Sequence, residues 1–161
     1  MKLYLLRHGQ AEYKSSTGKD IDRKLSDVGE KQVAQVKERL EQEVSEKPFL
    51  VLCSTADRTT ETYEGVKKAI KIQHEHFDKA YYLADLHTLL NLLWNIDDDA
   101  INILFIGHNN GISDIASYLT DQSIKIPTSG LVIIDFPDFD QLQETGLGTG
   151  TITGKCFPSV E

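Results

Sequence analysis

At its start the chain reads KLYLLRHG (residues 2–9), an apolar run that stops abruptly at an arginine, a histidine and a glycine. The run from Lys2 to Leu6 is short and apolar, which predicts a buried strand. The polar stretch from Gln10 to Lys24 then predicts a long loop. We therefore expect the first strand to deliver Arg7 and His8 to the edge of a sheet, beside that loop.

Strand-like and helix-like segments alternate along the rest of the chain. Apolar runs predict further buried strands at Phe49 to Cys53, Ile101 to Ile106 and Leu131 to Phe136. Helical spacing and capping residues predict helices from Ser26 to about Glu46, from about Asp57 to Lys71, from Asp85 to about Ile96 and from about Ile112 to Leu119. The segment from His74 to Leu83 shows no clear pattern, and strands in the tail from Gln141 to Phe157 cannot be placed. Because strands separated by helices favour parallel pairing, the sequence predicts a three-layer α/β/α sandwich with a mainly parallel central sheet.

The length and the charge of the chain exclude several classes of function. The chain has 161 residues, of which 40% are hydrophobic, and its 17 basic and 25 acidic side chains give a net charge of −8. This size predicts one domain over residues 1–161, and an acidic chain without a basic cluster argues against a nucleic-acid partner. The longest apolar runs fall short of the ~18 residues that a membrane span needs, and the first run is too short for a signal peptide. With only two cysteines, these features predict a cytoplasmic protein without a membrane partner.

Polar residues follow three of the predicted strands, at the edge where an open parallel sheet holds its ligands. The first strand delivers Arg7 and His8, the second leads to Arg58 in the first turn of a helix, and the third delivers His108. Arginine holds phosphate oxygens through a planar fork of donors, and a neutral imidazole can attack phosphorus to form a covalent intermediate. Two arginines and two histidines at one edge of the sheet therefore predict phosphoryl chemistry.

Several motifs of the chain resemble those of one known family. They are Leu3-Tyr4-Leu5-Leu6-Arg7-His8-Gly9, Asp22-Arg23-Lys24-Leu25-Ser26 followed by Gly29, Ser54 with Ala56, Arg58 and Thr62, Gly107-His108-Asn109 with Gly111, and Lys125-Ile126-Pro127-Thr128. In these motifs the sequence resembles the histidine phosphatase superfamily, also called phosphoglycerate-mutase-like, and within it the SixA-type phosphohistidine phosphatases. The resemblance covers positions 3 to about 136. It implies a compact, cofactor-independent phosphatase.

The resemblance implies roles for the same four residues that the strand ends single out. His8 is the implied nucleophile, and Arg7 and Arg58 are the implied phosphate clamps. His108 is the implied second histidine in contact with the phosphate. No cofactor and no metal ion is expected at this site.

Three further residues are candidates for the same site. Gln10 and Asn109 follow the two histidine motifs closely enough to contact the phosphate or its water, or else they satisfy local backbone groups. Many members of the family protonate the leaving group with an acidic residue that lies between the second arginine and the second histidine. The stretch that normally carries this acid is not found here. Asp85 is the candidate for the acid, and its alternative role is to cap a helix.

The missing acid bears on the substrate. An alkyl phosphate needs its departing oxygen protonated, which is typically worth about 10²–10⁴ in rate, whereas phosphohistidine leaves through an imidazole nitrogen. The sequence therefore favours hydrolysis of a phosphohistidine protein, of the histidine phosphotransfer type, or of another phosphorylated substrate. One alternative is a phosphatase or mutase for small phosphate esters, and the other is a non-catalytic module that binds phosphate or phosphoproteins. The sequence predicts no oligomeric state.

Overall fold

A computed structural model of the chain describes residues 1–43, 46–100 and 102–159. The strands are β1 (Lys2–Arg7), β2 (Phe49–Ser54), β3 (Ile72–Asp78), β4 (Asn102–Gly107), β5 (Leu131–Asp135) and β6 (Thr151–Cys156). The α-helices are α1 (Asp27–Gln42), α2 (Asp57–Val66), α3 (Leu86–Trp94) and α4 (Gly111–Thr120). Short 3₁₀ helices lie at Asp20–Asp22, Lys67–Ala69, Lys79–Tyr81 and Leu142–Glu144. Within the described ranges, six strands form one sheet in the order β3-β2-β4-β1-β5-β6.

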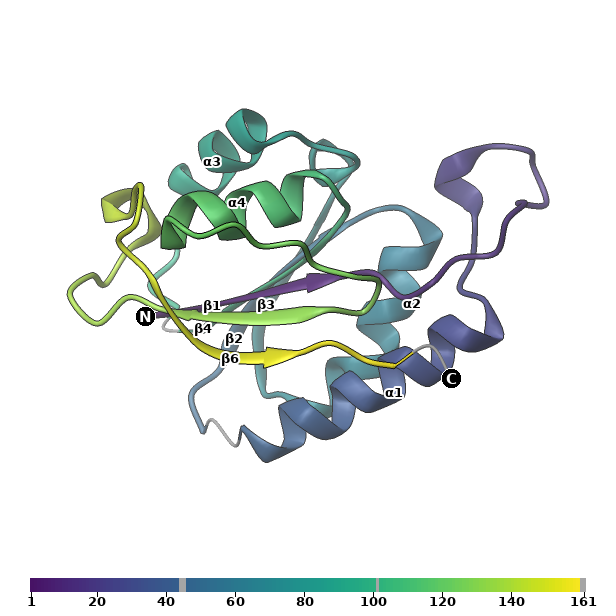
Figure 1. Cartoon of the computed structure of the whole chain (residues 1–161), viewed down its shortest axis with the longest axis horizontal. Coiled ribbons are helices and arrows are strands. Elements are labelled where there is room, and N and C mark those ends of the chain that lie inside the picture. Colours follow the sequence, from purple (N-terminus) through teal and green to yellow (C-terminus); the bar gives the residue numbers. More distant parts are fainter. Residues whose placement is uncertain (44–45, 101, 160–161) are drawn as a thin grey trace.

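The sheet is parallel over most of its width. β1 pairs in parallel with β4, β4 with β2, and β2 with β3. β5 runs antiparallel to β1, and β6 runs antiparallel to β5. Helices α3 and α4 cover one face of the sheet, and α1 and α2 cover the other (Figure 1). The predicted three-layer sandwich with a mainly parallel sheet is therefore confirmed.

Alternation along β1 builds a separate core on each face of the sheet. Leu3 and Leu5 pack into the core beneath α3 and α4, whereas Tyr4 and Leu6 pack into the core beneath α1 and α2. All four side chains are at most 1% exposed. A strand that is buried on both faces needs a continuous apolar run rather than an alternating one. This requirement explains why the first strand can be predicted from the sequence.

Helices α1 and α3 begin after the predicted capping residues, and α2 and α3 end earlier than their apolar periodicity suggests. Ser26 caps α1, since its Oγ accepts a hydrogen bond of 3.1 Å from the Gly29 backbone N–H. The predicted end of this helix runs past residues 44–45, which lie outside the described residues, as does Ile101 at the predicted start of β4. The prediction that α2 continues to Lys71 is wrong, because the chain tightens into a 3₁₀ helix after Val66. Likewise, α3 ends two residues before its predicted end.

Two strands, β3 and β6, were not predicted, and both lie at edges of the sheet. The inner residues of β3, among them His74 and His76, are exposed, and β6 alternates exposed with half-buried residues. An edge strand that faces water needs no apolar run and is commonly protected by charged or polar side chains. The hydrophobic signal that reveals an inner strand is therefore missing from both segments.

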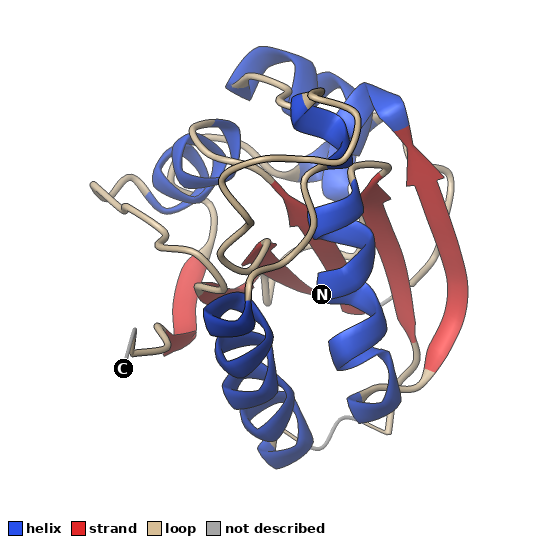
Figure 2. Ribbon diagram, turned by 90° about the vertical axis from the view of Figure 1, so that its right-hand side faces the viewer, coloured by secondary structure: helices blue, strands red, loops and turns tan. Residues whose placement is uncertain are grey.

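The fold brings the carboxyl ends of β1, β2 and β4 to one end of the molecule. The long loop between β1 and α1 projects beyond this end (Figure 1), and Figure 2 looks onto it, with loops lying in front of the sheet. In the register of β1 and β4, Arg7 lies opposite Gly107, so the residues that follow these strands are neighbours. Among the described residues, no helix combines the length and the apolar character that crossing a membrane requires.

One glycine fixes how closely α4 approaches the segment before α3. A Cβ on Gly111 would lie 2.0 Å from the backbone oxygen of Ala84, which is closer than any real contact. Replacing Gly111 with Ala therefore forces two backbone segments apart, and we expect the free energy of unfolding to fall by about 1–3 kcal/mol. Denaturant titration measures this change.

Gly146→Ala is the matched control, since a Cβ at that position meets no atom within 4 Å. We expect its free energy of unfolding to stay within about 0.5 kcal/mol of the wild type. A Gly111→Ala protein as stable as this control would contradict the tight contact.

Candidate active site

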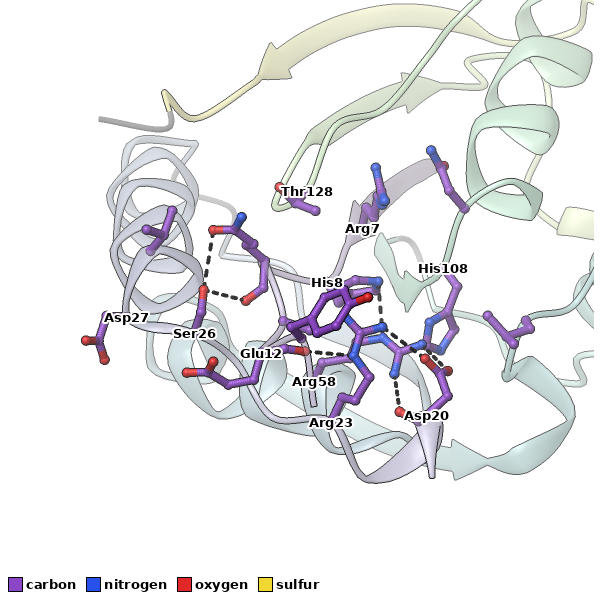
Figure 3. Close-up of a pocket in the computed structure, with 16 residues that line it drawn as sticks. Arg7, His8, Glu12, Asp20, Arg23, Ser26, Asp27, Arg58, His108 and Thr128 are labelled. Atoms are coloured by element: carbon purple, nitrogen blue, oxygen red, sulfur yellow. Dashed lines mark hydrogen bonds and ion pairs between the residues drawn. The ribbon is translucent and has the colours of Figure 1, made fainter. Parts of the chain in front are cut away.

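The predicted residues converge on an open pocket at the carboxyl end of the sheet (Figure 3). The pocket has a volume of about 860 Å³, and Arg7, His8, Arg58 and His108 all line it. Arg7 ends β1, Arg58 lies in the first turn of α2, and His108 follows β4 directly. The structure thus brings together the four residues that the strand ends single out.

Hydrogen bonds hold the His8 imidazole in one orientation. Its Nδ1 lies 2.7 Å from the carbonyl oxygen of Gly9. Because a carbonyl oxygen only accepts, Nδ1 carries the proton, and Nε2 of the neutral ring keeps its lone pair. Nε2 lies 3.4 Å from the Nε of Arg58. Burial, together with the charges of Arg58 and Arg7, lowers the pKa of His8 to about 4, so the ring is neutral at neutral pH.

The two arginines are fixed by different partners. Arg58 is 3% exposed and donates from Nη1 to the Asp20 backbone oxygen at 2.8 Å and from Nη2 to Asp20 Oδ2 at 2.9 Å. Arg7 donates from Nη1 to the Ile126 carbonyl at 3.1 Å, and its Nε is buried without a partner among the described residues. The pocket therefore contains two guanidinium groups, one of which is already paired with a carboxylate.

His108 lies beside His8, with 5.2 Å between the ring centroids. Its Nε2 is 2.7 Å from Ser54 Oγ at the end of β2, and its Nδ1 is buried without a partner in the described part of the chain. Burial, followed by the charges of His8 and Arg58, lowers the pKa of His108 to about 3. A hydroxyl that donates to Nε2 leaves the proton on Nδ1, so His108 can offer one N–H donor to a ligand in the pocket.

Thr62 connects the two motifs that carry the nucleophile candidate and the second arginine. Its Oγ1 accepts a hydrogen bond of 3.0 Å from the Gly9 backbone N–H and donates one of 2.7 Å to the Arg58 carbonyl. The Thr62 side chain is fully buried. Because both hydrogen bonds are sheltered from water, the turn after His8 is held at a fixed distance from α2.

The three remaining candidates have local partners. Gln10 lines the pocket, but its side-chain oxygen is within 3.4 Å of the Ser26 hydroxyl. Asn109 also lines the pocket, while its Nδ2 donates to the Ile126 carbonyl and its Oδ1 accepts from Ser113. Asp85 caps α3, accepting from the backbone N–H three residues ahead at 2.8 Å, and is not among the residues that line the pocket. The alternative role of Asp85, the helix cap, is thus the one that the structure displays.

The sequence assigned no role to three residues that lie at the site, Asp20, Arg23 and Tyr82. Asp20 and Arg23 line the pocket, and Asp20 Oδ1 forms an ion pair of 3.0 Å with Arg23. Tyr82 donates a hydrogen bond to Asp20 Oδ2, and its ring meets the His108 ring edge to face at 5.2 Å between centroids. Only the Asp22 to Ser26 motif marked this loop, and no local pattern distinguishes Asp20 from its neighbours, because its partner Arg58 is 38 positions away.

Metal ligation finds no support among the side chains that the structure describes. No three histidine, cysteine, aspartate or glutamate side chains gather there as a metal site. His74 pairs instead with Asp98 at 3.1 Å, on the exposed edge of the sheet.

Comparison with known proteins identifies similar sequences among the histidine phosphatases and in a plant protein. Residues 3–80 match the model of the histidine phosphatase superfamily (branch 1). An uncharacterized chloroplastic protein of Arabidopsis thaliana is 32% identical over 143 residues, which make up 83% of this chain and 65% of that protein. The chain therefore spans less than two thirds of the length of this curated relative.

Two solved structures share the fold over nearly the whole chain. A SixA structure from Nakamurella multipartitia aligns with a TM-score of 0.80 at 20% identity, covering 98% of this chain and 95% of that chain. The protein histidine phosphatase SixA in complex with tungstate aligns with a TM-score of 0.77 at 19% identity, covering 96% of both chains. At these identities the likeness concerns the fold.

Two buried neutral histidines predict a loss of stability toward acid. The pKa values of His8 and His108 are about 4 and about 3 in the folded state, against about 6.5 for an unperturbed histidine. Between these values the unfolded chain binds more protons than the folded one. The free energy of unfolding is therefore highest above about pH 6.5 and falls as the pH decreases, by up to about 1.4 kcal/mol per pH unit for each histidine.

Denaturant titrations at about pH 7.5 and about pH 5 measure this dependence. The His108→Asn protein should lose part of it, whereas His87→Asn, at an exposed position of α3, should keep all of it. A wild-type protein whose free energy of unfolding is the same at both pH values would contradict the burial of two neutral imidazoles.

Proposed function

We propose that the chain, whose residues 3–80 match the model of the histidine phosphatase superfamily, is a member of that superfamily and a phosphohistidine phosphatase that works through a covalent phospho-His8 intermediate. The substrate in this proposal is a phosphorylated protein, of the histidine phosphotransfer type. The reaction requires no cofactor: the phosphoryl group moves to His8 and then to water.

The observation that carries the proposal is the hydrogen bond between His8 Nδ1 and the Gly9 carbonyl, 2.7 Å long. It directs the proton to Nδ1 and leaves Nε2 as the nucleophile, on the side of the ring that faces Arg58. The lowered pKa of His8, to about 4, keeps this lone pair available at neutral pH. An imidazole held only for structural reasons has no need of an unprotonated nitrogen directed at an arginine in an open pocket.

The groups around Nε2 suit a phosphoryl ligand. Arg58 and Arg7 supply positive charge, and Nε of Arg7 is a buried donor without a partner in the described structure. His108 Nδ1 is a second such donor. Donors fixed in advance around a transferring phosphoryl group stabilise the negative charge of its transition state. The fold of the tungstate-bound SixA, an oxyanion complex, supports the same assignment.

The proposed reaction has two steps. In the first, Nε2 of His8 attacks phosphorus, and the bond from phosphorus to the substrate nitrogen breaks as the new N–P bond forms. In the second, water attacks phospho-His8, releasing inorganic phosphate and restoring the neutral imidazole. A phosphoimidazole that is protonated on its other ring nitrogen leaves as neutral imidazole, so the first step needs no proton at the scissile nitrogen.

The carboxylates of the pocket favour a neutral imidazole over an alkoxide as the leaving group, because none of them is placed to donate a proton to an alkoxide. The hydrogen bond from Tyr82 and those from Arg23 and Arg58 hold the pKa of Asp20 well below its usual range, so this carboxylate has no proton to give. In Figure 3 the carboxylates of Glu12 and Asp27 point away from His8. Among the described carboxylates that line the pocket, an ester substrate would thus find no general acid beside its departing oxygen, and an ester normally relies on one for about 10²–10⁴ in rate.

The nucleophile can be tested by trapping. A protein carrying ³²P-phosphohistidine is mixed with the wild type and with His8→Ala, and the reaction is quenched rapidly in alkali, where phosphohistidine survives. We expect label on the wild type that turns over to inorganic phosphate, and neither label nor turnover with His8→Ala. Saturable phosphate binding without trapped label would favour the non-catalytic binding module instead.

The same preparation decides between substrate classes. We expect a higher kcat/KM for the phosphohistidine protein than for small phosphate esters, because none of the described carboxylates of the pocket is placed to protonate an alkoxide. Esters hydrolysed with a much higher kcat/KM would replace the phosphohistidine assignment by that of a small-ester phosphatase. Transfer of phosphate between positions of one ester, without release, would indicate a mutase.

The role of Arg58 predicts a combined effect on binding and rate. Arg58→Ala removes a buried donor fork from the phosphoryl oxygens, and we expect kcat to fall by roughly 10²–10³, with a higher KM. Steady-state kinetics on the phosphohistidine protein provide the measurement. Arg39→Ala is the control, because Arg39 pairs with Glu43 on α1, outside the pocket. Near wild-type kinetics for Arg58→Ala would exclude it as a phosphate clamp.

A further inference from the structure

Every nitrogen of the Arg58 side chain already has a partner within the protein. Nη1 donates to the Asp20 backbone oxygen at 2.8 Å, Nη2 donates to Asp20 Oδ2 at 2.9 Å, and Nε lies 3.4 Å from His8 Nε2. Two of these three contacts are made by one residue of the long loop. A phosphoryl group at His8 that binds the Nη atoms of Arg58 would therefore share both of them with Asp20, which already takes one N–H from each.

Asp20 occupies this position as an anion. Its Oδ2 also accepts from the Tyr82 hydroxyl, and its Oδ1 pairs with Arg23 at 3.0 Å (Figure 3). The Asp20 side chain is 45% exposed, whereas the Arg58 side chain that it covers is 4% exposed. The carboxylate therefore lies between the buried guanidinium and the water that fills the pocket mouth, and it can leave without crossing the protein interior.

We propose that Asp20 is a displaceable internal anion that competes with phosphate for Arg58, so that it limits the affinity for phosphate and favours release of the phosphate product. The effect on product release rests on the proposed function. The competition between Asp20 and phosphate for Arg58 is a property of phosphate binding alone. Asp20 thus acts on phosphate through Arg58 and is not itself a catalytic group.

The balance of charge supports displacement over shared binding. Arg7 and Arg58 carry two positive charges, Arg23 carries a third that Asp20 Oδ1 already pairs at 3.0 Å, and a phosphoryl dianion brings two negative charges. If Asp20 stayed in place, its carboxylate would add a third negative charge within contact distance of the same guanidinium. Like charges in a partly desolvated site repel strongly. If Asp20 moves into water together with its ion-pair partner Arg23, the dianion and the other two arginines neutralise each other.

A residue that merely positions Arg58 would have the opposite effect. Its loss would let the guanidinium turn away and would weaken phosphate binding. Loss of a competitor strengthens binding, so the sign of the change separates the two roles. A misfolded variant also cannot bind phosphate more tightly than the wild type, which makes a gain of affinity specific evidence.

Isothermal titration with inorganic phosphate provides the test. Asp20→Asn keeps the size and one acceptor oxygen of the side chain but removes its charge, and a charge-assisted hydrogen bond is roughly twice as strong as a neutral one. We expect the Kd of phosphate to fall about tenfold in Asp20→Asn, or about 1.4 kcal/mol. Asp22→Asn is the matched control on the same loop. Asp22 pairs only with Thr17 in the described contacts and does not line the pocket, so its Kd should equal that of the wild type.

A second variant, Tyr82→Phe, weakens the hold on the Asp20 carboxylate without changing Asp20 itself. Tyr82→Phe removes the hydroxyl that holds Asp20 Oδ2 and leaves every charge in place. We expect a smaller decrease in Kd, about two- to fivefold, as for the loss of one side-chain hydrogen bond. This variant keeps the proposal testable even if Asp20→Asn fails to fold.

The outcomes separate this inference from the proposed function. Weaker or unchanged phosphate binding in folded Asp20→Asn or Tyr82→Phe overturns the competition, as does a failure of every protein to bind phosphate. Tighter binding in these variants, without any trapped phospho-enzyme in the wild type, supports the competition and overturns only the catalytic assignment. In steady-state kinetics on the phosphohistidine protein, the competition further requires that KM and the inhibition constant of phosphate fall together in Asp20→Asn.

Discussion

The site depends on bringing two guanidinium groups and two imidazoles together in one place, where Arg58, His8 and His108 are buried and Arg7 is half-buried. Arginine stays charged in any protein environment, so the cost of burial falls on the histidines, whose charged forms are disfavoured both by desolvation and by the neighbouring cations. This constraint lowers the pKa of His8 to about 4 and that of His108 to about 3. The same excess of positive charge requires an anion, which Asp20 supplies within the protein.

Hydrogen bonds of the scaffold prevent these groups from rearranging. The parallel pairing of β1 with β4 fixes Arg7 opposite Gly107, and the His8 backbone N–H donates to the Gly107 carbonyl at 3.1 Å. From the other side, Thr62 ties the turn after His8 to α2. Because these hydrogen bonds join the strand ends to the first turn of α2, His8, Arg7 and Arg58 are held in place without a ligand.

The parts of this site that the sequence predicts are those attached to buried strands. Arg7, His8 and His108 follow apolar runs directly, and Arg58 follows one after a short turn, so strand pattern and sheet topology together bring them to one edge. The edge strands β3 and β6 lack such runs, since water covers them. Asp20 lies on a polar loop, and its place is set by contacts with Arg58 and Tyr82 far along the chain. Residues whose position depends on such long-range contacts carry no local signal.

A neutral nucleophile among fixed cations also restricts the leaving group. The cations stabilise negative charge on the phosphoryl oxygens, and the hydrogen bond from Tyr82, together with those from Arg23 and Arg58, keeps the pKa of Asp20 low, so this carboxylate holds no proton. A site built in this way is poor at protonating an alkoxide and needs a substrate whose leaving group departs without help. An N-phosphorylated imidazole, which leaves as a neutral ring, meets that requirement. The buried Arg58 therefore links the two properties, since it faces His8 Nε2 and also helps to keep Asp20 without a proton.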